Sequence, residues 1–168
     1  GAAGAAPAAL GNRQGGQAAF DSVRDRVVVF GGWTGSVAGN DTWEYDGNAW
    51  TQVVTTTVPP GRWSELAYDS QRGVVVMYGG SSVPTILDGT WEYDGTDWTQ
   101  ITTASSPGLR SRHGLAYDSA RGVMVLFGGI NGSYVLKNDT WEYNGTNWTQ
   151  RPAAPAGLTA RQLFGMSY

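Results

Sequence analysis

One short pattern occurs three times in this 168-residue chain: Thr-Trp-Glu-Tyr, then Asp-Gly or Asn-Gly, then a second Trp. The three copies lie within residues 41–52, 89–100 and 138–150. The first Trp of the three copies is Trp43, Trp91 and Trp141, so the copies are spaced by 48 and 50 residues. A period of this length is typical of repeat architectures, in which each repeat is one supersecondary unit packed on its neighbours. We therefore expect a tandem array of similar units.

The third copy shows the parts of one repeat most clearly. A short apolar segment at residues 115–117 leads through a turn to a β-rich run at 123–127, which ends in a Gly-Gly pair. After a loop, Trp and Tyr alternate with polar residues at 140–143, as in a half-buried strand. Asn144 and Gly145 form a strong hairpin signal, and Trp148 lies in the returning strand. Each repeat is therefore predicted to contain four short antiparallel strands. No segment shows sustained helical periodicity, so the predicted class is all-β.

Tandem four-stranded units of this length predict the blades of a β-propeller, because radial repetition protects the edges of the sheets. A β-rich run ending in Gly-Gly, a variable loop, then Trp-Glu-Tyr-Asp and a later Trp also resembles the kelch repeat, over residues 13–168. In kelch proteins the Gly-Gly pair and the later Trp are structural blade residues. The resemblance assigns a structural role to Gly31, Gly32, Gly79, Gly80, Gly128, Gly129, Trp50, Trp98 and Trp148, and we add the recurring Trp43, Trp91 and Trp141.

The repeats predict a linker, three blades and part of a fourth. Their expected bounds are 1–12 for the linker, 13–61, 62–111 and 112–160 for the blades, and 161–168 for the first strand of a further blade. Known kelch propellers generally have five to seven blades. An array of three leaves unpaired edges and apolar faces at its ends. We therefore expect a portion of a larger propeller, or else a strand-swapped assembly of two copies; we favour the first.

Composition excludes several classes of function. The net charge is −3 and no run of basic residues occurs, so we expect no nucleic-acid partner. The absence of cysteine excludes disulfides, thiolate metal sites and cysteine nucleophiles. No apolar run approaches the roughly 18 residues of a membrane-spanning helix, so we expect no membrane insertion. Residues 1–10 lack an initiator Met and a basic start, and they are not an intact signal peptide. The sequence leaves the compartment open, and of the alternatives we favour an extracellular or periplasmic location.

The connections between strands indicate where a contact surface would lie. In a four-stranded meander, the second-to-third connections and the blade-to-blade connections share one face. They vary between copies in length and content, at residues 33–40, 81–88 and 130–138, and at 53–61, 101–111 and 151–160. Variable loops on a rigid scaffold are where binding usually occurs. We therefore expect any site to lie on this variable-loop face.

Four arginines recur at the start of the predicted first strands. They are Arg13, Arg62, Arg112 and Arg161, at spacings of 49, 50 and 49 residues. One interpretation is a ring of guanidinium groups that binds a carboxylate or sulfate ligand. The other, which strict recurrence favours, is an ion pair from each Arg to a neighbouring blade, with Glu44, Glu92 or Glu142 as the partner. The residues that follow these arginines differ from one another: Gln14, Trp63, His113 and Gln162. Such variation favours a ligand surface, and an uneven junction between loop and strand is the alternative explanation.

A few further residues are candidates for ligand contact. His113 is the only histidine, so it is a poor metal ligand, and it has no evident nucleophile beside it. We expect no metal and no cofactor. Trp33 and Trp63 stand outside the repeat pattern and are the two tryptophans available for stacking on a ligand. The candidate ligand-binding residues are therefore Arg13, Arg62, Trp63, Arg112, His113, Arg161 and Trp33.

We carry three hypotheses for function. The first is a non-catalytic binding or scaffold module that contacts a protein or ligand through the variable-loop face. The second follows from the resemblance, because kelch-like propellers include galactose oxidase-type copper enzymes and sialic acid mutarotases. The copper chemistry would need a cysteine-linked tyrosine and more than one histidine, which leaves a carbohydrate-binding or carbohydrate-active site with Arg62, Arg112, His113 and Glu65. The third is an assembly element whose partner is a second copy of the chain.

Overall fold

The computed structural model describes residues 10–153 and 155–168, and within these residues the regular structure is entirely β. Twelve strands form three four-stranded antiparallel sheets. No helix suited to crossing a membrane is found in this described part. The first nine residues of the expected linker lie outside it. The predictions of an all-β class and of three four-stranded antiparallel units are confirmed.

Each sheet is a meander whose strands follow one another in chain order. The first sheet contains β1 (Gln17–Asp21), β2 (Arg26–Phe30), β3 (Thr42–Tyr45) and β4 (Trp50–Val53). The second contains β5 (Leu66–Asp69), β6 (Val74–Ser82), β7 (Thr85–Tyr93) and β8 (Trp98–Ile101). The third contains β9 (Gly114–Asp118), β10 (Val123–Phe127), β11 (Thr140–Tyr143) and β12 (Trp148–Gln150). One repeat of the sequence is thus one sheet.

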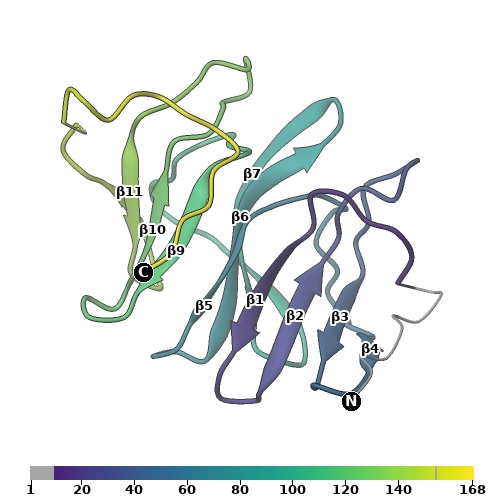
Figure 1. Ribbon diagram of the computed structural model, residues 1–168. Coiled ribbons are helices and arrows are strands. Elements are labelled where there is room, and N and C mark those ends of the chain that lie inside the picture. The colour runs from purple at the N-terminus through teal and green to yellow at the C-terminus, as the bar shows by residue number, and fades with distance from the viewer. Residues whose placement is uncertain (1–9, 154) are drawn as a thin grey trace.

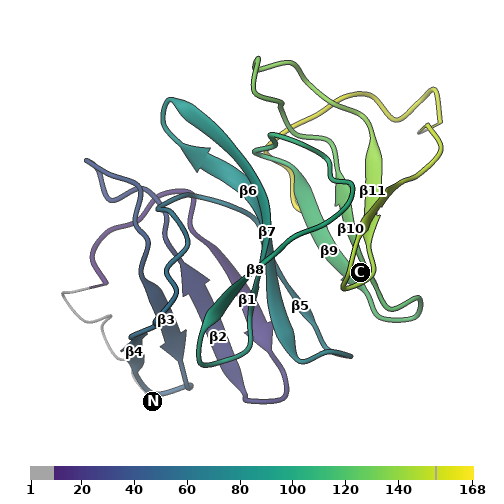
Figure 2. The same ribbon diagram turned by 180° about the vertical axis from the view of Figure 1, so that it is seen from behind.

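The three sheets lie side by side, with the second between the first and the third (Figure 1). Figure 2 shows the same order from behind. The first strands of the sheets are neighbours, since β1 contacts β5 and β5 contacts β9. This multi-sheet arrangement is consistent with the blades of a propeller. We expected residues 161–168 to form the first strand of a further blade, but they form no strand. A strand requires hydrogen-bonded pairing partners, and this segment instead runs alongside β9 (Figure 1).

The second sheet is buried on both faces, because successive side chains of a strand point to opposite sides. On β6, Val75 and Met77 pack into an apolar cluster against the first sheet. The alternate residues Val76 and Tyr78 pack into a second cluster against the third sheet. This explains the near-continuous apolar run of β6. The two clusters between sheets are the core of the molecule.

The later Trp of the second and third repeats joins its sheet to the one before it. The indole Nε1 of Trp98 donates to Oγ1 of Thr42 in the first sheet at 2.9 Å, and its ring lies edge-on to Phe30 at 5.1 Å. Trp148 repeats this contact one sheet later, donating to Thr90 at 2.8 Å. Both indoles are almost fully buried, which is where an aromatic ring with a satisfied N–H contributes most.

The Gly-Gly pairs allow the next linker to approach the sheet closely. Gly79 and Gly80 both have positive φ angles, of 57° and 105°. A Cβ at Gly79 would lie only 2.3 Å from the carbonyl oxygen of Arg110, a contact that no larger residue could make. Gly80 N–H donates to that same carbonyl at 2.8 Å. The pair therefore receives the backbone of the following repeat.

An arginine in the first turn of the first and second sheets forms the other repeated contact between sheets. In the second sheet, Arg72 Nε pairs with Asp69 at 2.7 Å, and Arg72 Nη1 pairs with Glu92. From the third sheet, the Tyr143 hydroxyl donates to Glu92 at 2.8 Å, and the guanidinium lies 5.3 Å from the centre of the Tyr143 ring. The contact thus combines an ion-pair network with a cation–π interaction.

This network corrects one sequence-based expectation. We expected Glu44, Glu92 and Glu142 to pair with the arginines at the start of the first strands. They pair instead with the turn arginines Arg24, Arg72 and Arg121 of their own sheets. Each of these Glu residues lies in the third strand of its sheet. This strand places the Glu beside the turn between the first two strands, which carries the arginine.

Arg72 and Arg121 form a matched pair for measuring the contact between sheets. Arg121 makes the same two ion pairs but has no Tyr ring over it in the described residues, and its side chain is 52% exposed against 28% for Arg72. We expect Arg72→Ala to lower the free energy of unfolding by about 2 kcal/mol, because it leaves the buried carboxylates without their cation and removes the guanidinium from the Tyr143 ring. Arg121→Ala should cost less than about 1 kcal/mol. Urea unfolding of both variants as the single 17.9 kDa chain measures the difference, and equal losses would contradict the assignment.

Candidate functional site

The arginines that recur in the structure are Arg13, Arg62, Arg110 and Arg161. Nη1 donates to the first carbonyl of a Gly-Gly pair from Arg13 to Gly31, from Arg62 to Gly79 and from Arg110 to Gly128, at 2.8, 2.8 and 3.0 Å. The backbone carbonyls of Arg62, Arg110 and Arg161 accept from Gly32, Gly80 and Gly129 of the preceding sheet. Arg110 therefore occupies the place that we expected for Arg112. Equal spacing alone could not distinguish these two arginines, which stand two residues apart.

The guanidinium groups of Arg13, Arg62 and Arg110 bind groups of the protein itself. Arg13 and Arg110 each pair with a carboxylate of their own sheet, Asp41 and Asp139. Arg62 has no such partner, because Gly89 stands where the other two sheets have Asp, and its guanidinium lies over the Trp91 ring at 5.9 Å. Burial lowers the pKa of Arg62 to about 10. This geometry favours the structural interpretation of the arginine ring over ligand binding.

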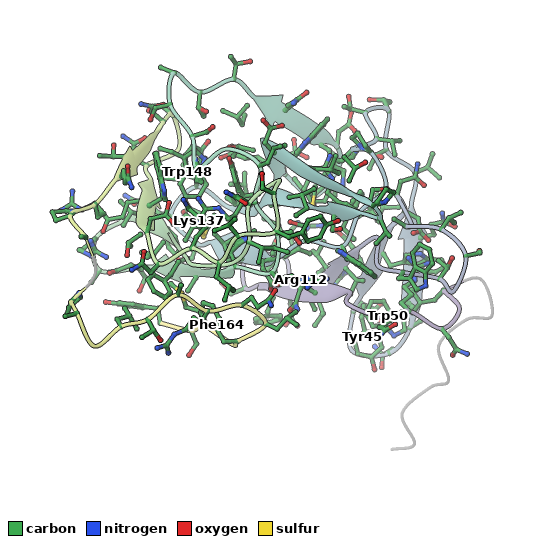
Figure 3. The ribbon with its side chains drawn as sticks, turned by 90° about the horizontal axis from the view of Figure 1, so that it is seen from above. Tyr45, Trp50, Arg112, Lys137, Trp148 and Phe164 are labelled. Atoms are coloured by element: carbon green, nitrogen blue, oxygen red, sulfur yellow. The ribbon has the colours of Figure 1, made fainter. Side chains whose placement is uncertain are left out.

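Arg112 occupies a position near the start of β9 that the second sheet lacks. Leu115 follows Arg110 by five residues, whereas the corresponding Leu66 follows Arg62 by four. The extra residue has a φ of 58°, and Gly15 and Leu163 have similar positive φ values, of 67° and 56°, at the corresponding places. This local bulge carries the Arg112 side chain toward the C-terminal segment, where Nη1 donates to Gln162 Oε1 at 3.2 Å. Figure 3 shows Arg112 between Phe164 and the end of the molecule that carries Tyr45.

A cavity of about 280 Å³ opens where the first strands begin. Its lining includes Gln14, Gln17, Trp63, Glu65, Arg112 and Leu163. A second hollow of about 380 Å³ continues along the first strands and shares Gln17, Glu65 and Leu163 with the cavity. Its walls are Ala18, Leu66, Leu115, Phe164 and Met166 among others. The two hollows are adjacent through these shared residues, and we call them the mouth cavity and the inner hollow.

Glu65 is the acidic group of the mouth cavity. It immediately precedes β5, in the row that Gln17 and Gly114 occupy on the neighbouring first strands. Burial raises the pKa of Glu65 to about 7. At neutral pH this carboxyl is therefore partly protonated, so it can both donate and accept a hydrogen bond. The residues lining the two hollows include no second carboxyl and no His, so the acid–base pair used by many hydrolases is not formed there.

Trp63 brings an aromatic ring to the mouth cavity. Trp33 packs against it, with ring centroids 5.9 Å apart, but does not line the cavity itself. Trp63 follows Arg62 directly, and its backbone bridges to Ser81. The residues at the same place in the other two sheets are Gln14 and Ser111, which bridge to Trp33 and Ile130. One position of the repeat therefore presents a different side chain from each sheet.

His113 faces away from the mouth cavity. It is 1% exposed, and its ring lies edge-on to Tyr78 of the second sheet at 6.1 Å. Neither ring nitrogen has a hydrogen-bond partner in the described part of the chain. Burial, aided by the charge of Arg110, lowers the pKa of His113 to about 3. The imidazole is thus a neutral core group, and the corresponding position in the C-terminal segment is Phe164, which packs on Phe127 in the same way.

The structure brings together only part of the predicted set. Trp63 and Arg112 line one cavity, with Trp33 behind Trp63, whereas the side chains of Arg13, Arg62, His113 and Arg161 do not line it. Glu65, named only in the carbohydrate hypothesis, and the two glutamines are the additions. Their sequence signal was their place at the start of the first strands. Within residues 10–153 and 155–168, no three His, Cys, Asp or Glu side chains gather closely enough to hold a metal ion.

The buried His113 predicts a sensitivity to acid. Its pKa is lower in the folded chain than in the unfolded chain, so the unfolded state takes up the proton first as pH falls below about 6.5. Stability should therefore fall between about pH 6.5 and pH 3. His113→Phe removes this proton uptake. The free energy of unfolding of the variant relative to the wild type should therefore be about 2 to 3 kcal/mol higher at pH 4.5 than at pH 7.5. Urea unfolding at both pH values measures this difference. If the variant and the wild type lose the same free energy of unfolding between pH 7.5 and pH 4.5, a buried neutral imidazole is contradicted.

The comparisons with known proteins add no family to this geometry. No protein-family model matches the sequence, and no curated protein matches it. The kelch resemblance seen in the repeats therefore continues as a proposal. The function of the chain must be argued from the sheets, the recurring arginines and the mouth cavity.

Proposed function

We propose that the chain is part of a kelch-type β-propeller and acts as a non-catalytic binding module. Its ligand site is the mouth cavity at the start of the first strands. Three side-by-side meander sheets with neighbouring first strands support the propeller. The absence of a second carboxyl, a His or a Cys from the cavity lining supports binding rather than catalysis.

The observation that carries the proposal is the contrast between the arginines and the residues after them. The arginines repeat the same contacts in each sheet and hold the linkers in place. The next residues, Gln14, Trp63 and Ser111, occupy equivalent positions yet differ completely in chemistry. Together they line one cavity. A uniform scaffold with a varied cavity lining is what a binding site on a repeat fold requires.

The chemistry of the cavity favours a carbohydrate. An indole offers a flat apolar face, and amide, hydroxyl, guanidinium and partly protonated carboxyl groups offer both donors and acceptors for hydroxyls. The volume of about 280 Å³ is at the small end of ligand pockets, which suits one sugar ring rather than a peptide. Arg112 supplies the single guanidinium of the lining, which would favour a sugar acid over a neutral sugar.

Binding can be tested with glucose, galactose and glucuronate as probes. We expect dissociation constants near the millimolar range, with glucuronate the tightest, measured by NMR titration. Trp63→Ala should weaken binding at least tenfold, because it removes the stacking surface. Val54→Ala, at an exposed side chain that follows β4 of the first sheet, is the control and should leave binding unchanged. No shift with any of the three sugars at millimolar concentration would overturn the carbohydrate proposal.

Glu65 predicts a pH effect of the opposite sign to that of His113. Its pKa is higher in the folded chain than the ordinary 4.5, so the folded state holds the proton more tightly. Stability should therefore fall as pH rises from about 4.5 through about 7. Glu65→Gln keeps the shape without the charge and should be more stable than the wild type by about 2 to 3 kcal/mol at pH 8, and by much less at pH 4.5. Thermal unfolding across this range measures it; a constant difference would show that Glu65 is well solvated.

A further inference from the structure

The two contacts between sheets use the same residues in the same roles. The earlier sheet supplies a Thr, a Glu and an Arg, and the later sheet supplies a Trp and a Tyr. Between the first and second sheets these are Thr42, Glu44 and Arg24 with Trp98 and Tyr93. Between the second and third they are Thr90, Glu92 and Arg72 with Trp148 and Tyr143. The contact is directional, with an acceptor face on one sheet and a donor face on the next.

The outer side of the third sheet presents a further acceptor face. It carries Thr140, Glu142 and Arg121 at the corresponding positions of the repeat, and Arg121 pairs with Glu142 as in the other sheets. Thr42 and Thr90 are 1% exposed under their tryptophans, whereas Thr140 is only half-buried. This acceptor face has no donor over it in the described chain.

The outer side of the first sheet presents the matching donor face. It carries Tyr45 and Trp50, which are half-buried, whereas Trp98 and Trp148 are 1% and 0% exposed. The Tyr45 hydroxyl donates to Gly47 O of its own turn at 2.8 Å rather than to a Glu. A Cβ at Gly47 would meet nothing within 4 Å, whereas one at Gly95 would meet Arg24. Figure 3 shows Tyr45 and Trp50 at the end of the molecule opposite the third sheet.

We propose that the donor face of one copy of the chain docks on the acceptor face of a second copy. Trp50 donates to Thr140, the Tyr45 hydroxyl donates to Glu142, and the Arg121 guanidinium covers the Tyr45 ring. The occupant is a second copy because the donor set that fits the acceptor face is present on the chain itself. The contact is continuous with two interfaces already formed in the molecule, and it needs no ligand in the mouth cavity.

The number of copies follows from the sheets. A donor face meeting an acceptor face is a head-to-tail contact, which closes a ring or forms an open filament. Propellers typically contain four to eight blades, and six is the only multiple of three in that range. Two copies with two identical contacts therefore complete the ring. This count, unlike the contact itself, rests on the propeller proposed above.

The C-terminal segment, residues 161–168, occupies the place of the incoming first strand. Phe164 packs on Phe127 at 6.0 Å as His113 packs on Tyr78, and the Arg161 carbonyl accepts from Gly129. An incoming β1 would compete for this place. β1 is paired with β2 along its whole length, whereas the segment forms no strand. We therefore expect the docking copy to keep β1 and to displace the segment.

The test is the mass of the full chain in solution. Light scattering between roughly 1 and 100 μM should show a species of twice 17.9 kDa. Thr140→Arg and Trp50→Ala should each give the 17.9 kDa chain, with folding confirmed by circular dichroism. Thr149→Arg is the matched control on the same face, because the corresponding Thr51 and Thr99 stay exposed at formed contacts. A wild type that stays at 17.9 kDa throughout overturns the proposal, as does a control that dissociates like Thr140→Arg.

Mixing the two dissociating variants tests the direction of the contact. The Trp50→Ala copy retains its acceptor face and the Thr140→Arg copy retains its donor face, so the mixture should form heterodimers in native mass spectrometry. The absence of heterodimers would contradict a head-to-tail contact.

Phe164→Ala should lower the dissociation constant of the wild-type dimer several-fold, because it loosens the segment that competes with β1. Sugar binding should persist in the Thr140→Arg chain, so failure of either proposal is distinguishable from failure of the other.

Discussion

The contact between neighbouring sheets is the interaction on which the rest of this structure depends. No single sheet can bury both of its faces, and among the three sheets of the described residues only the second has a neighbour on each side. The Trp indole and the Tyr hydroxyl give this apolar contact a fixed register, because each must reach one acceptor on the facing sheet. Burial supplies most of the stabilisation, and the hydrogen bonds determine how the sheets are placed.

That fixed placement explains why the mouth cavity can vary without cost to the fold. Arg62 and Arg110 hold the linkers against the Gly-Gly pairs from inside the sheets. The residue after each arginine is therefore positioned by backbone hydrogen bonds and not by its own side chain. Trp63 and Ser111 can then differ freely, and the asymmetry of the cavity comes from equivalent positions of a nearly symmetric scaffold.

The repeat pattern predicted the fold well and the cavity only in part. Strand order and hairpin turns are local, so the Trp-Glu-Tyr and Asn-Gly signals were enough to predict the four strands of each sheet. Arg112 fills a position of positive φ that the second repeat lacks, and spacing alone could not separate this place from that of Arg110. His113 was misleading for a similar reason, since a one-residue shift decides whether a side chain faces the cavity or the core. The raised pKa of Glu65 depends on burial by three sheets, which no local pattern encodes.

A directional contact also constrains how such an array can end. Every sheet that supplies Thr, Glu and Arg on one side supplies Trp and Tyr on the other, so any open array leaves one unpaired set at each end. Apolar faces with unsatisfied donors and acceptors favour association, and sheets with such edges pair readily with other chains. The half-buried Trp50 and Thr140 are complementary to each other by the same contacts that join Trp98 to Thr42. The interaction that builds the array from within is therefore also the one that would join it to a second copy.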